Sequence, residues 1–307
     1  MDPKMRILIG YDGSNVSENV IEDLRWAGLP EKALVTVLSA ADVFIPPPPD
    51  ASTLSVARPA IEKSRESGMD ALRVSQSLAE HGAEHVKKVF PGWKVFPESC
   101  AASPAWGLVK KAVEWNADLI VVGAHGHSRM GRFIGSVSQM VVIHAAQSVR
   151  VTRPRPAPQA ERLRILVGVD GSEGSQAAIH SVANRAWGPG VDVYILGVME
   201  PNMSALLTHL TPSEIRWLLE QDQDKRDTLG RVLESHAKAL REKGMIVTCR
   251  VEIGDPKRIL VEQAELWKAD SIFLGARGLG NLKRFLIGGV SAAVSARAHC
   301  SVEIVRP

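Results

Sequence analysis

The chain contains the same sequence pattern twice, and this internal repeat limits its fold more than any other feature. Residues 5–14 read Met-Arg-Ile-Leu-Ile-Gly-Tyr-Asp-Gly-Ser, and residues 163–172 read Leu-Arg-Ile-Leu-Val-Gly-Val-Asp-Gly-Ser. A second matching pair begins at 135 and at 288, and each member runs on into a short apolar segment that ends in Arg-Pro. Such a repeat predicts two copies of one domain, each of a usual domain size.

The positions of the repeats set the expected domain boundaries. We predict domain 1 over residues 1–154, a linker over 155–161 and domain 2 over 162–307. The linker follows from its Pro-rich, polar composition, which is typical of a stiff polar connection.

Short β-rich segments alternate with helical ones in each copy. This alternation, with apolar strands, favours a parallel sheet that is covered by helices on both faces. The strands predicted for copy one are residues 6–11, 33–40, 93–100, 118–122 and 149–152. Its predicted helices run from Ser14 to near Gly28, from 57 to 90, from Ser103-Pro104 onward and from 137 to 146.

Copy two has clearer helix signals. Thr211-Pro212-Ser213-Glu214 resembles a capping box with Pro at the first helical position, and it predicts a long helix that stops at Gly244. Asp255-Pro256 repeats the helix start at Ser103-Pro104. Copy one instead carries the extended run Pro46–Pro49, where a helix cannot form.

Composition excludes several classes of protein. The 37 basic and 34 acidic residues leave a net charge of only +3, without the basic stripe of a nucleic-acid-binding protein. Apolar runs are too short to span a membrane, and no signal peptide is visible, so we expect a cytoplasmic protein. Cys100, Cys249 and Cys300 occupy non-equivalent places and indicate unpaired thiols in a reducing compartment.

A glycine-rich loop follows the fourth strand of each copy and leads into a helix. Glycines there let backbone N–H groups approach a phosphate, and the helix N-terminus that follows favours an anion. The loop lacks the Gly-Lys-Ser/Thr of a Walker A motif, and it follows strand four rather than strand one, which excludes a Rossmann fingerprint. In a doubly wound sheet it lies at the carboxyl ends of the strands, where ligands bind.

The pattern G-x2-G-x9-G-[S/T], together with an Asp after strand one, resembles the ATP-binding type of universal stress protein (the UspA family). Both copies match over nearly their whole length, so the chain is similar to a tandem member of that family. The resemblance implies an α/β fold of two repeated domains, each a five-stranded, parallel, doubly wound sheet of the adenine nucleotide alpha-hydrolase-like type. It also implies that ATP, with or without Mg²⁺, binds between the strand-one turn and the glycine loop.

Site residues follow from the resemblance position by position. Asp12 and Asp170 match the aspartate that meets the adenine end, and the remaining matches lie beside it or form the ribose and phosphate cradle. In copy one these are Gly10, Ala40, Gly123, Gly126, Gly135, Ser136 and Val137; in copy two they are Gly168, Val198, Gly275, Gly278, Gly288, Gly289 and Val290.

Each copy departs from the pattern in its own way. Copy one keeps Ser136, but only eight residues separate Gly126 from Gly135 where the family has nine. Copy two has nine, but Gly289 stands where Ser or Thr is expected. Losing one hydroxyl removes a bond worth about 0.5–1.5 kcal/mol, whereas a shifted loop can lose several. This comparison favours copy two as the site that retains nucleotide.

Other interpretations of the same residues stay open. Asp12 and Asp170 are also typical turn residues before Gly. His125 and His127 invite a metal site, but Arg277 and Leu279 replace them in copy two, so no metal is expected. The cations near the glycine loops, which could contact phosphate or simply be solvated, are Arg129, Arg132, Lys283 and Arg284.

Three functions are compatible with these observations. The first is a stress-response switch that binds ATP. The second is a slow ATPase or phosphotransferase, which the lack of a recurring nucleophile or base disfavours. The third is a nucleotide-free scaffold for protein partners. The last strands, 149–152 and 302–305, resemble the family's dimerising edges, so we expect an intrachain pseudo-dimer of the two domains, and a homodimer is a further option.

Overall fold

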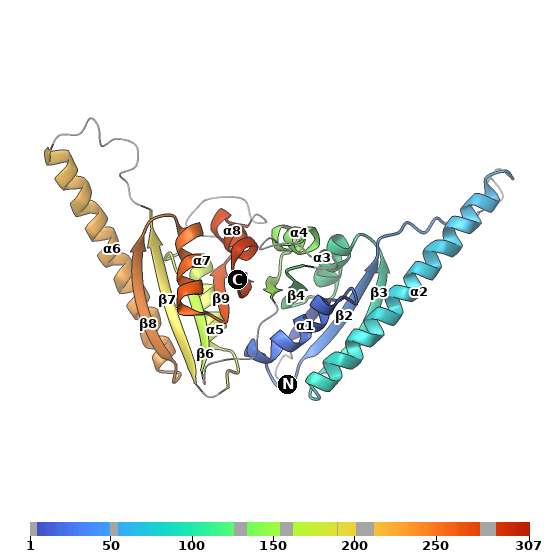
Figure 1. Ribbon diagram of the computed structural model, residues 1–307, viewed down its shortest axis with the longest axis horizontal. Helices are drawn as coiled ribbons and strands as arrows, with labels where there is room; N and C mark the ends of the chain where they lie inside the picture. Colours follow the sequence, from blue (N-terminus) through green and yellow to red (C-terminus); the bar gives the residue numbers. More distant parts are fainter. Residues whose placement is uncertain are drawn as a thin grey trace. The chain divides into compact units, whose positions relative to one another are not determined.

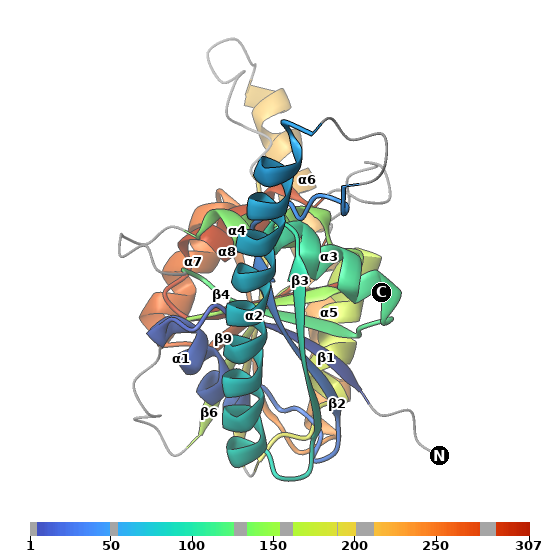
Figure 2. The same cartoon turned by 90° about the vertical axis from the view of Figure 1, so that its right-hand side faces the viewer.

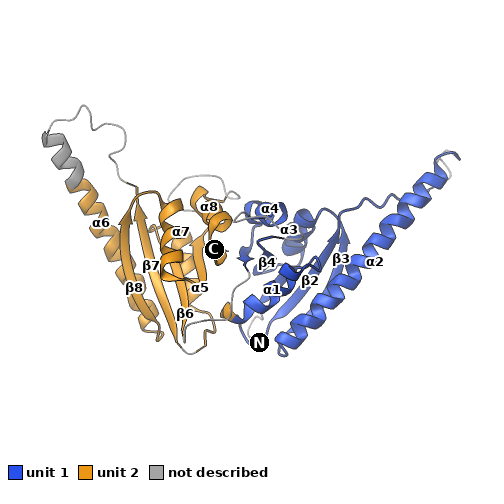
Figure 3. Ribbon diagram, in the orientation of Figure 1, with its two compact units in different colours: residues 1–25, 30–154 blue, residues 26–29, 155–307 orange. Residues whose placement is uncertain are grey.

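The computed structural model describes residues 5–49, 55–125, 134–153, 162–188, 190–200, 212–276 and 287–307, with the backbone alone for 212–219. The chain divides into two compact units (Figure 3). Unit 1 consists of residues 1–25 and 30–154, and unit 2 of residues 26–29 and 155–307.

Unit 1 contains a five-stranded parallel sheet in the order β3-β2-β1-β4-β5. Figure 1 labels its strands β2, β3 and β4. Its strands are β1 (Arg6–Gly10), β2 (Leu34–Ala41), β3 (Lys94–Ala101), β4 (Leu119–Gly123) and β5 (Ser148–Thr152). Helices α1 (Asn15–Asp23) and α2 (Arg58–Val89) pack together, and α3 (Pro104–Glu114) packs on α4 (Ser136–His144). Three consecutive β1 residues, Ile7, Leu8 and Ile9, are fully buried, as expected when helices cover both faces of a sheet.

Unit 2 repeats this architecture with the strand order β10-β9-β6-β7-β8. Its strands are β6 (Leu163–Gly168), β7 (Val191–Met199), β8 (Ile246–Ile253), β9 (Ser271–Gly275) and β10 (Ser301–Val305). Its helices are α5 (Glu173–Ala183), α6 (Pro212–Arg241), α7 (Pro256–Trp267) and α8 (Gly289–Arg297). The predicted fold, two α/β copies with a five-stranded parallel sheet each, is therefore confirmed.

One predicted helix end and one predicted helix cap need correction. The first helix ends at Asp23 rather than near Gly28, because the 3₁₀ turn Leu24–Trp26 tightens its end. Ser103 precedes α3 as predicted, but its side chain makes no capping hydrogen bond, whereas Asp255 accepts one from the Lys257 N–H at 3.0 Å. The linker 155–161 and the capping-box residue Thr211 lie outside the described residues.

Helix α2 is longer than the strands that it covers. Its 32 residues extend about 48 Å, whereas the eight residues of β3 extend about 26 Å. Figure 2 shows α2 running along β3, and its first half projects beyond the sheet. There the proline-rich segment lies against it: Arg65 donates to the Pro46 carbonyl at 2.9 Å, and Gly68 faces Ile45.

Within the part of the chain that the structure describes, no helix is both long enough and apolar enough to cross a membrane.

Candidate functional site

A cavity of about 290 Å³ opens at the carboxyl ends of β1, β2 and β4 in unit 1. It lies where the strand order reverses: the chain runs outward from β1 through β2 to β3, then returns to β4 on the other side of β1. In open parallel sheets this switch point leaves a crevice, because the helices that follow the two neighbouring strands cover opposite faces. The topology of the sheet therefore explains the position of the cavity.

The cavity brings together residues from distant parts of the sequence. Seven of the eight residues predicted for copy one line it, and the eighth, Gly126, lies outside the described residues. These seven are Gly10, Asp12, Ala40, Gly123, Gly135, Ser136 and Val137. Their side-by-side placement is a finding of the structure, whereas their contact with a nucleotide stays a prediction.

Sequence reasoning missed nine residues that also line the cavity. They are Tyr11, Ser17, Leu38, Ser39, Pro104, Leu108, Val122, His125 and Ser138. Most are neighbours of predicted residues along a strand or helix. Pro104 and Leu108 come instead from α3, whose start at Ser103-Pro104 was visible in the sequence but carried no sign of a ligand-facing position.

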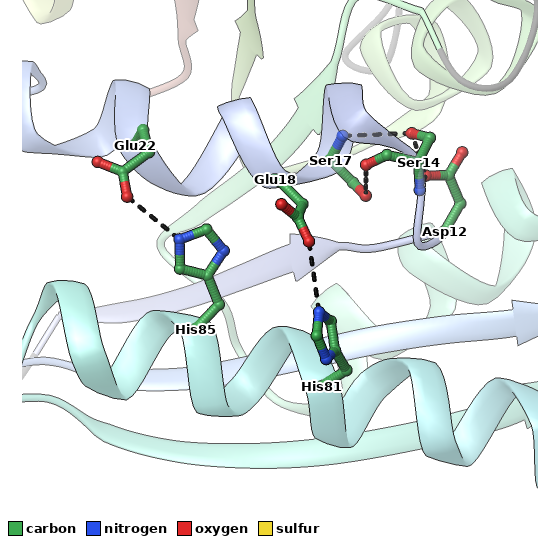
Figure 4. Close-up of polar contacts among 7 residues, drawn as sticks. All are labelled: Asp12, Ser14, Ser17, Glu18, Glu22, His81 and His85. Carbon is green, nitrogen blue, oxygen red and sulfur yellow. Dashed lines mark hydrogen bonds and ion pairs between the residues drawn. The ribbon is translucent and has the colours of Figure 1, made fainter.

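Asp12 forms the turn between β1 and α1 (Figure 4). Its Oδ1 atom accepts from the Ser14 N–H at 3.0 Å and from the Ser14 hydroxyl at 2.6 Å. The Ser14 Oγ atom then caps α1 by accepting from the Ser17 N–H at 3.2 Å. Gly13 has a φ of 76°, which a side chain rarely adopts. The interpretation of Asp12 as a turn residue is thus correct, and the turn places its carboxylate at the cavity.

The start of α4 forms another wall of the cavity. Gly135 is its N-cap residue and offers no side-chain acceptor, so among the described residues no side chain caps the first N–H groups of the helix, which also lack an intrahelical partner. The Ser138 hydroxyl donates to the Gly123 carbonyl at 2.5 Å and holds this helix end against the end of β4. The wall consequently presents backbone donors and a positive helix end, which suit an anion.

Helix α2 supports α1 through two contacts between its histidines and the glutamates of α1 (Figure 4). His81 Nε2 lies 3.3 Å from Glu18 Oε1, and His85 Nε2 lies 3.1 Å from Glu22 Oε1. Although burial alone would raise it, hydrogen bonds from Arg25 and His85 hold the pKa of Glu22 below its usual value. Burial and the nearby Glu18 carboxylate raise the pKa of Tyr11 to about 12, so its phenol stays neutral at physiological pH.

Unit 2 reproduces the local geometry around its predicted residues. Asp170 Oδ1 accepts from the Ser172 N–H at 3.0 Å and from its hydroxyl at 2.6 Å, as Asp12 does with Ser14. The Ser291 hydroxyl donates to the Gly275 carbonyl at 2.6 Å, which matches Ser138 and Gly123 in unit 1. Gly278 lies outside the described residues.

The remaining predicted residues of unit 2 lie at matching places. Val198 is near the end of β7, Gly168 ends β6, and α8 begins with Gly289 and Val290 after its N-cap residue Gly288.

The floor of the site differs between the copies. A Cβ atom placed on Gly10 would lie 2.9 Å from Leu108 and 3.4 Å from Val122. A Cβ atom on the matching Gly168 would lie 2.4 Å from Leu274, which replaces Val122, and 3.2 Å from Leu260. The larger Leu274 side chain therefore leaves less room beside Gly168, a difference that the motif comparison did not reveal.

Among the described residues, no three or more His, Cys, Asp or Glu side chains form a cluster able to hold a metal ion. His125 lines the cavity, and His127 lies outside the described residues.

Comparison with known proteins gives a consistent result. The family model described as "Universal stress protein family" matches residues 4–153 and again residues 161–306. A universal stress protein of Mycolicibacterium smegmatis is 28% identical over 311 residues, which cover 98% of this chain and 97% of that protein. One from Methanocaldococcus jannaschii is 31% identical over 143 residues, which cover 47% of this chain and 81% of that protein.

Among solved structures, a universal stress protein from Archaeoglobus fulgidus has a TM-score of 0.60 at 18% identity, covering 98% of this chain and 96% of that chain. At this identity the likeness concerns the fold alone. Since the family model matches nearly the whole length in two successive copies, the chain belongs to the universal stress protein family and carries two of its domains.

Proposed function

We propose that the chain binds an adenine nucleotide, ATP, at the carboxyl ends of its parallel strands and serves as a stress-response switch. One observation carries the proposal: the seven described residues that the ATP-binding motif assigns to copy one line a single cavity at the switch point of the sheet. A cavity of about 290 Å³ approaches the size that small-molecule sites have.

The walls of the cavity suit different parts of a nucleotide. Apolar side chains from Leu38, Leu108 and Val122 offer contacts for an adenine ring. The Asp12 carboxylate can accept hydrogen bonds from amino or hydroxyl groups. Ser136 and the first N–H groups of α4 can donate to phosphate oxygens. Mg²⁺, where present, would be held mainly by phosphate oxygens and water, a usual arrangement for this ion.

Helix α4 connects the cavity to strand β5 within unit 1. A bound phosphate would add acceptors at the start of α4, whose far end precedes β5 by only a few residues. The nucleotide therefore favours one arrangement of this helix start, and a ligand shifts an equilibrium only through such a difference in affinity.

Steric blocking tests the site. Ala40→Phe fills the cavity of copy one, and Val198→Phe is the matched change at the corresponding place in copy two. If a copy binds ATP, we expect calorimetry to show one binding site fewer in the variant that blocks that copy than in the wild type. The circular dichroism spectrum of each variant should match that of the wild type, because the fold is kept. Mass spectrometry of gently purified wild-type protein gives the number of nucleotides per chain independently.

Two results would contradict the proposal: ATP binding unaffected by both substitutions, or a wild-type melting temperature unmoved by millimolar ATP. A ligand that binds only the folded state must raise that temperature. The second result would favour the scaffold function instead.

A further inference from the structure

Copy two has a lysine where copy one has an alanine. This lysine lies next to Gly289, the position at which copy two lacks the hydroxyl group of the motif. Lys257 is the second residue of α7 and matches Ala105 of α3, which is buried. Gly289 begins α8 and matches Ser136, which begins α4. A Cβ atom on Gly289 would lie 3.8 Å from Lys257 Cε and 4.0 Å from its Nζ. The ammonium group consequently lies beside the first turn of α8.

Lys257 is an exposed residue in an electrostatically unfavourable position for a cation. It belongs to the first turn of α7, and its ammonium group lies near the start of α8, where the dipoles of both helices disfavour positive charge. Among the described residues, its Nζ atom makes no hydrogen bond or ion pair. The neighbouring Arg258, by contrast, donates to both carboxylate oxygens of Glu262 at 2.9 and 2.8 Å.

Two helix ends and an unpaired ammonium group therefore present positive charge to the same space. The acidic residue beside them, Asp255, uses its Oδ1 atom to cap α7 through the Lys257 N–H. Among the described residues the α8 N-terminus receives no side-chain cap, because its N-cap residue is Gly288. An anion between the two helix starts would relieve the repulsion and satisfy the free donors.

We propose that Lys257 binds a phosphate group of the nucleotide in copy two and replaces the hydroxyl that Gly289 lacks. The inference rests on the proposed function, since it names the phosphate contact of that same site. A hydrogen bond to a charged group is stronger than one to a neutral hydroxyl, so the exchange strengthens phosphate binding in particular. Copy two should accordingly prefer nucleotides over nucleosides more strongly than copy one does.

The test uses the full chain with copy one blocked by Ala40→Phe, so that only copy two contributes. In this background Lys257→Gln removes the charge and keeps most of the side chain. We expect calorimetry to show ATP and AMP affinities lower by about 10- to 100-fold, with adenosine affinity unchanged. Arg258→Gln, which removes a paired cation from the same turn, is the matched control and should change all three affinities by less than about threefold.

A rescue makes the test specific to the missing hydroxyl. Adding Gly289→Ser to Lys257→Gln should recover part of the ATP affinity, by about two- to tenfold. Equal losses for ATP and adenosine, or no loss for either, would overturn the role of Lys257 while leaving nucleotide binding intact.

A second measurement separates this inference from the proposed function. Lysine side-chain NMR of the unblocked wild-type chain, titrated with pyrophosphate, should show the Lys257 Cε resonance shifting with saturation. If the chain binds neither ATP nor adenosine but Lys257 responds to pyrophosphate, the proposed nucleotide function fails and the anion site stands. If Lys257 responds to neither pyrophosphate nor ATP, the inference is wrong.

Discussion

At the level of single residues, Asp12 shows how one side chain serves a turn and faces a cavity at once, and Asp170 forms the same turn in unit 2. In both units the Oδ1 atom closes the turn with the same serine distances, 3.0 and 2.6 Å. A carboxylate has two oxygens and several acceptor positions, so turn formation does not exclude a ligand contact. The interpretation of these aspartates as turn residues is therefore compatible with their predicted contact with a ligand.

Two glycines of copy two should respond oppositely to alanine. A Cβ atom on Gly275 would lie 2.3 Å from the backbone of Gly174, whereas none of the nearest atoms to a Cβ on Gly289 is closer than 3.8 Å. We expect Gly275→Ala to lower the free energy of unfolding by about 1–3 kcal/mol through overpacking. Gly289→Ala should leave it unchanged or raise it by up to about 1 kcal/mol, because alanine is the better helix former.

Urea denaturation of both variants checks this prediction, and Gly289→Ala serves as the control for Gly275→Ala. Equal stabilities of the two variants would mean that the close approach of α5 to β9 does not constrain Gly275.

We predict that His236 on α6 makes unit 2 sensitive to acid. Burial lowers its pKa below the usual value, so the unfolded chain binds the proton more readily than the folded one. Its contribution to stability is therefore complete above pH 6.5 and is lost as the pH falls from there toward the folded-state pKa. We expect His236→Leu to flatten the fall in melting temperature between pH 7 and pH 5.

His81, an exposed histidine of α2, provides the comparison, and His81→Leu should leave that part of the pH profile of unit 2 unchanged. A His236→Leu profile parallel to that of the wild type would show that His236 does not cause the sensitivity.

At the level of elements, a buried ion pair ties α1 to the last strand of unit 1. Arg150 on β5 donates from Nε and Nη2 to Asp23 Oδ2 at 3.0 and 2.8 Å, and both side chains are almost fully buried. Unit 2 carries Glu303 at the position of Arg150, and Glu303 pairs with Arg185. The last strand thus contributes the cation in one unit and the anion in the other.

Breaking this pair should destabilise unit 1 strongly. Arg150→Met leaves the Asp23 carboxylate buried without that guanidinium, and we expect a loss of about 3–5 kcal/mol in the free energy of unfolding. The double variant Asp23→Leu, Arg150→Met removes both charges and should recover most of that loss. Chemical denaturation of the wild type, the single variant and the double variant measures these free energies of unfolding. A double variant no more stable than Arg150→Met would show that the loss comes from the favourable ion pair itself and not from an unpaired buried carboxylate.

At the level of the whole molecule, the match to the family model and the structure agree that the chain has two universal stress protein domains. How the two domains associate with each other stays a prediction. Each unit builds its own five-stranded sheet, with the edge strands β5 and β10 at equivalent places. That these edges form an intrachain pseudo-dimer stays an expectation from the family.

The sequence by itself determined the repeat, the strand and helix order, the family and the residues of the motif. These features depend on local patterns: the period of apolar residues, turn chemistry such as Asp12-Gly13-Ser14, and spacing within one copy. Most predicted elements are consequently correct to within a few residues.

Only the tertiary structure decided which residues meet. That Lys257 lies beside Gly289, that Leu274 narrows the space at Gly168, and that Arg150 pairs with Asp23 follow from helices and strands packing across large sequence separations. No local pattern encodes such contacts, because they depend on the order of strands in the sheet and on the face that each helix covers. The sequence therefore predicted two similar sites, and the packing around the predicted residues differs between the two units.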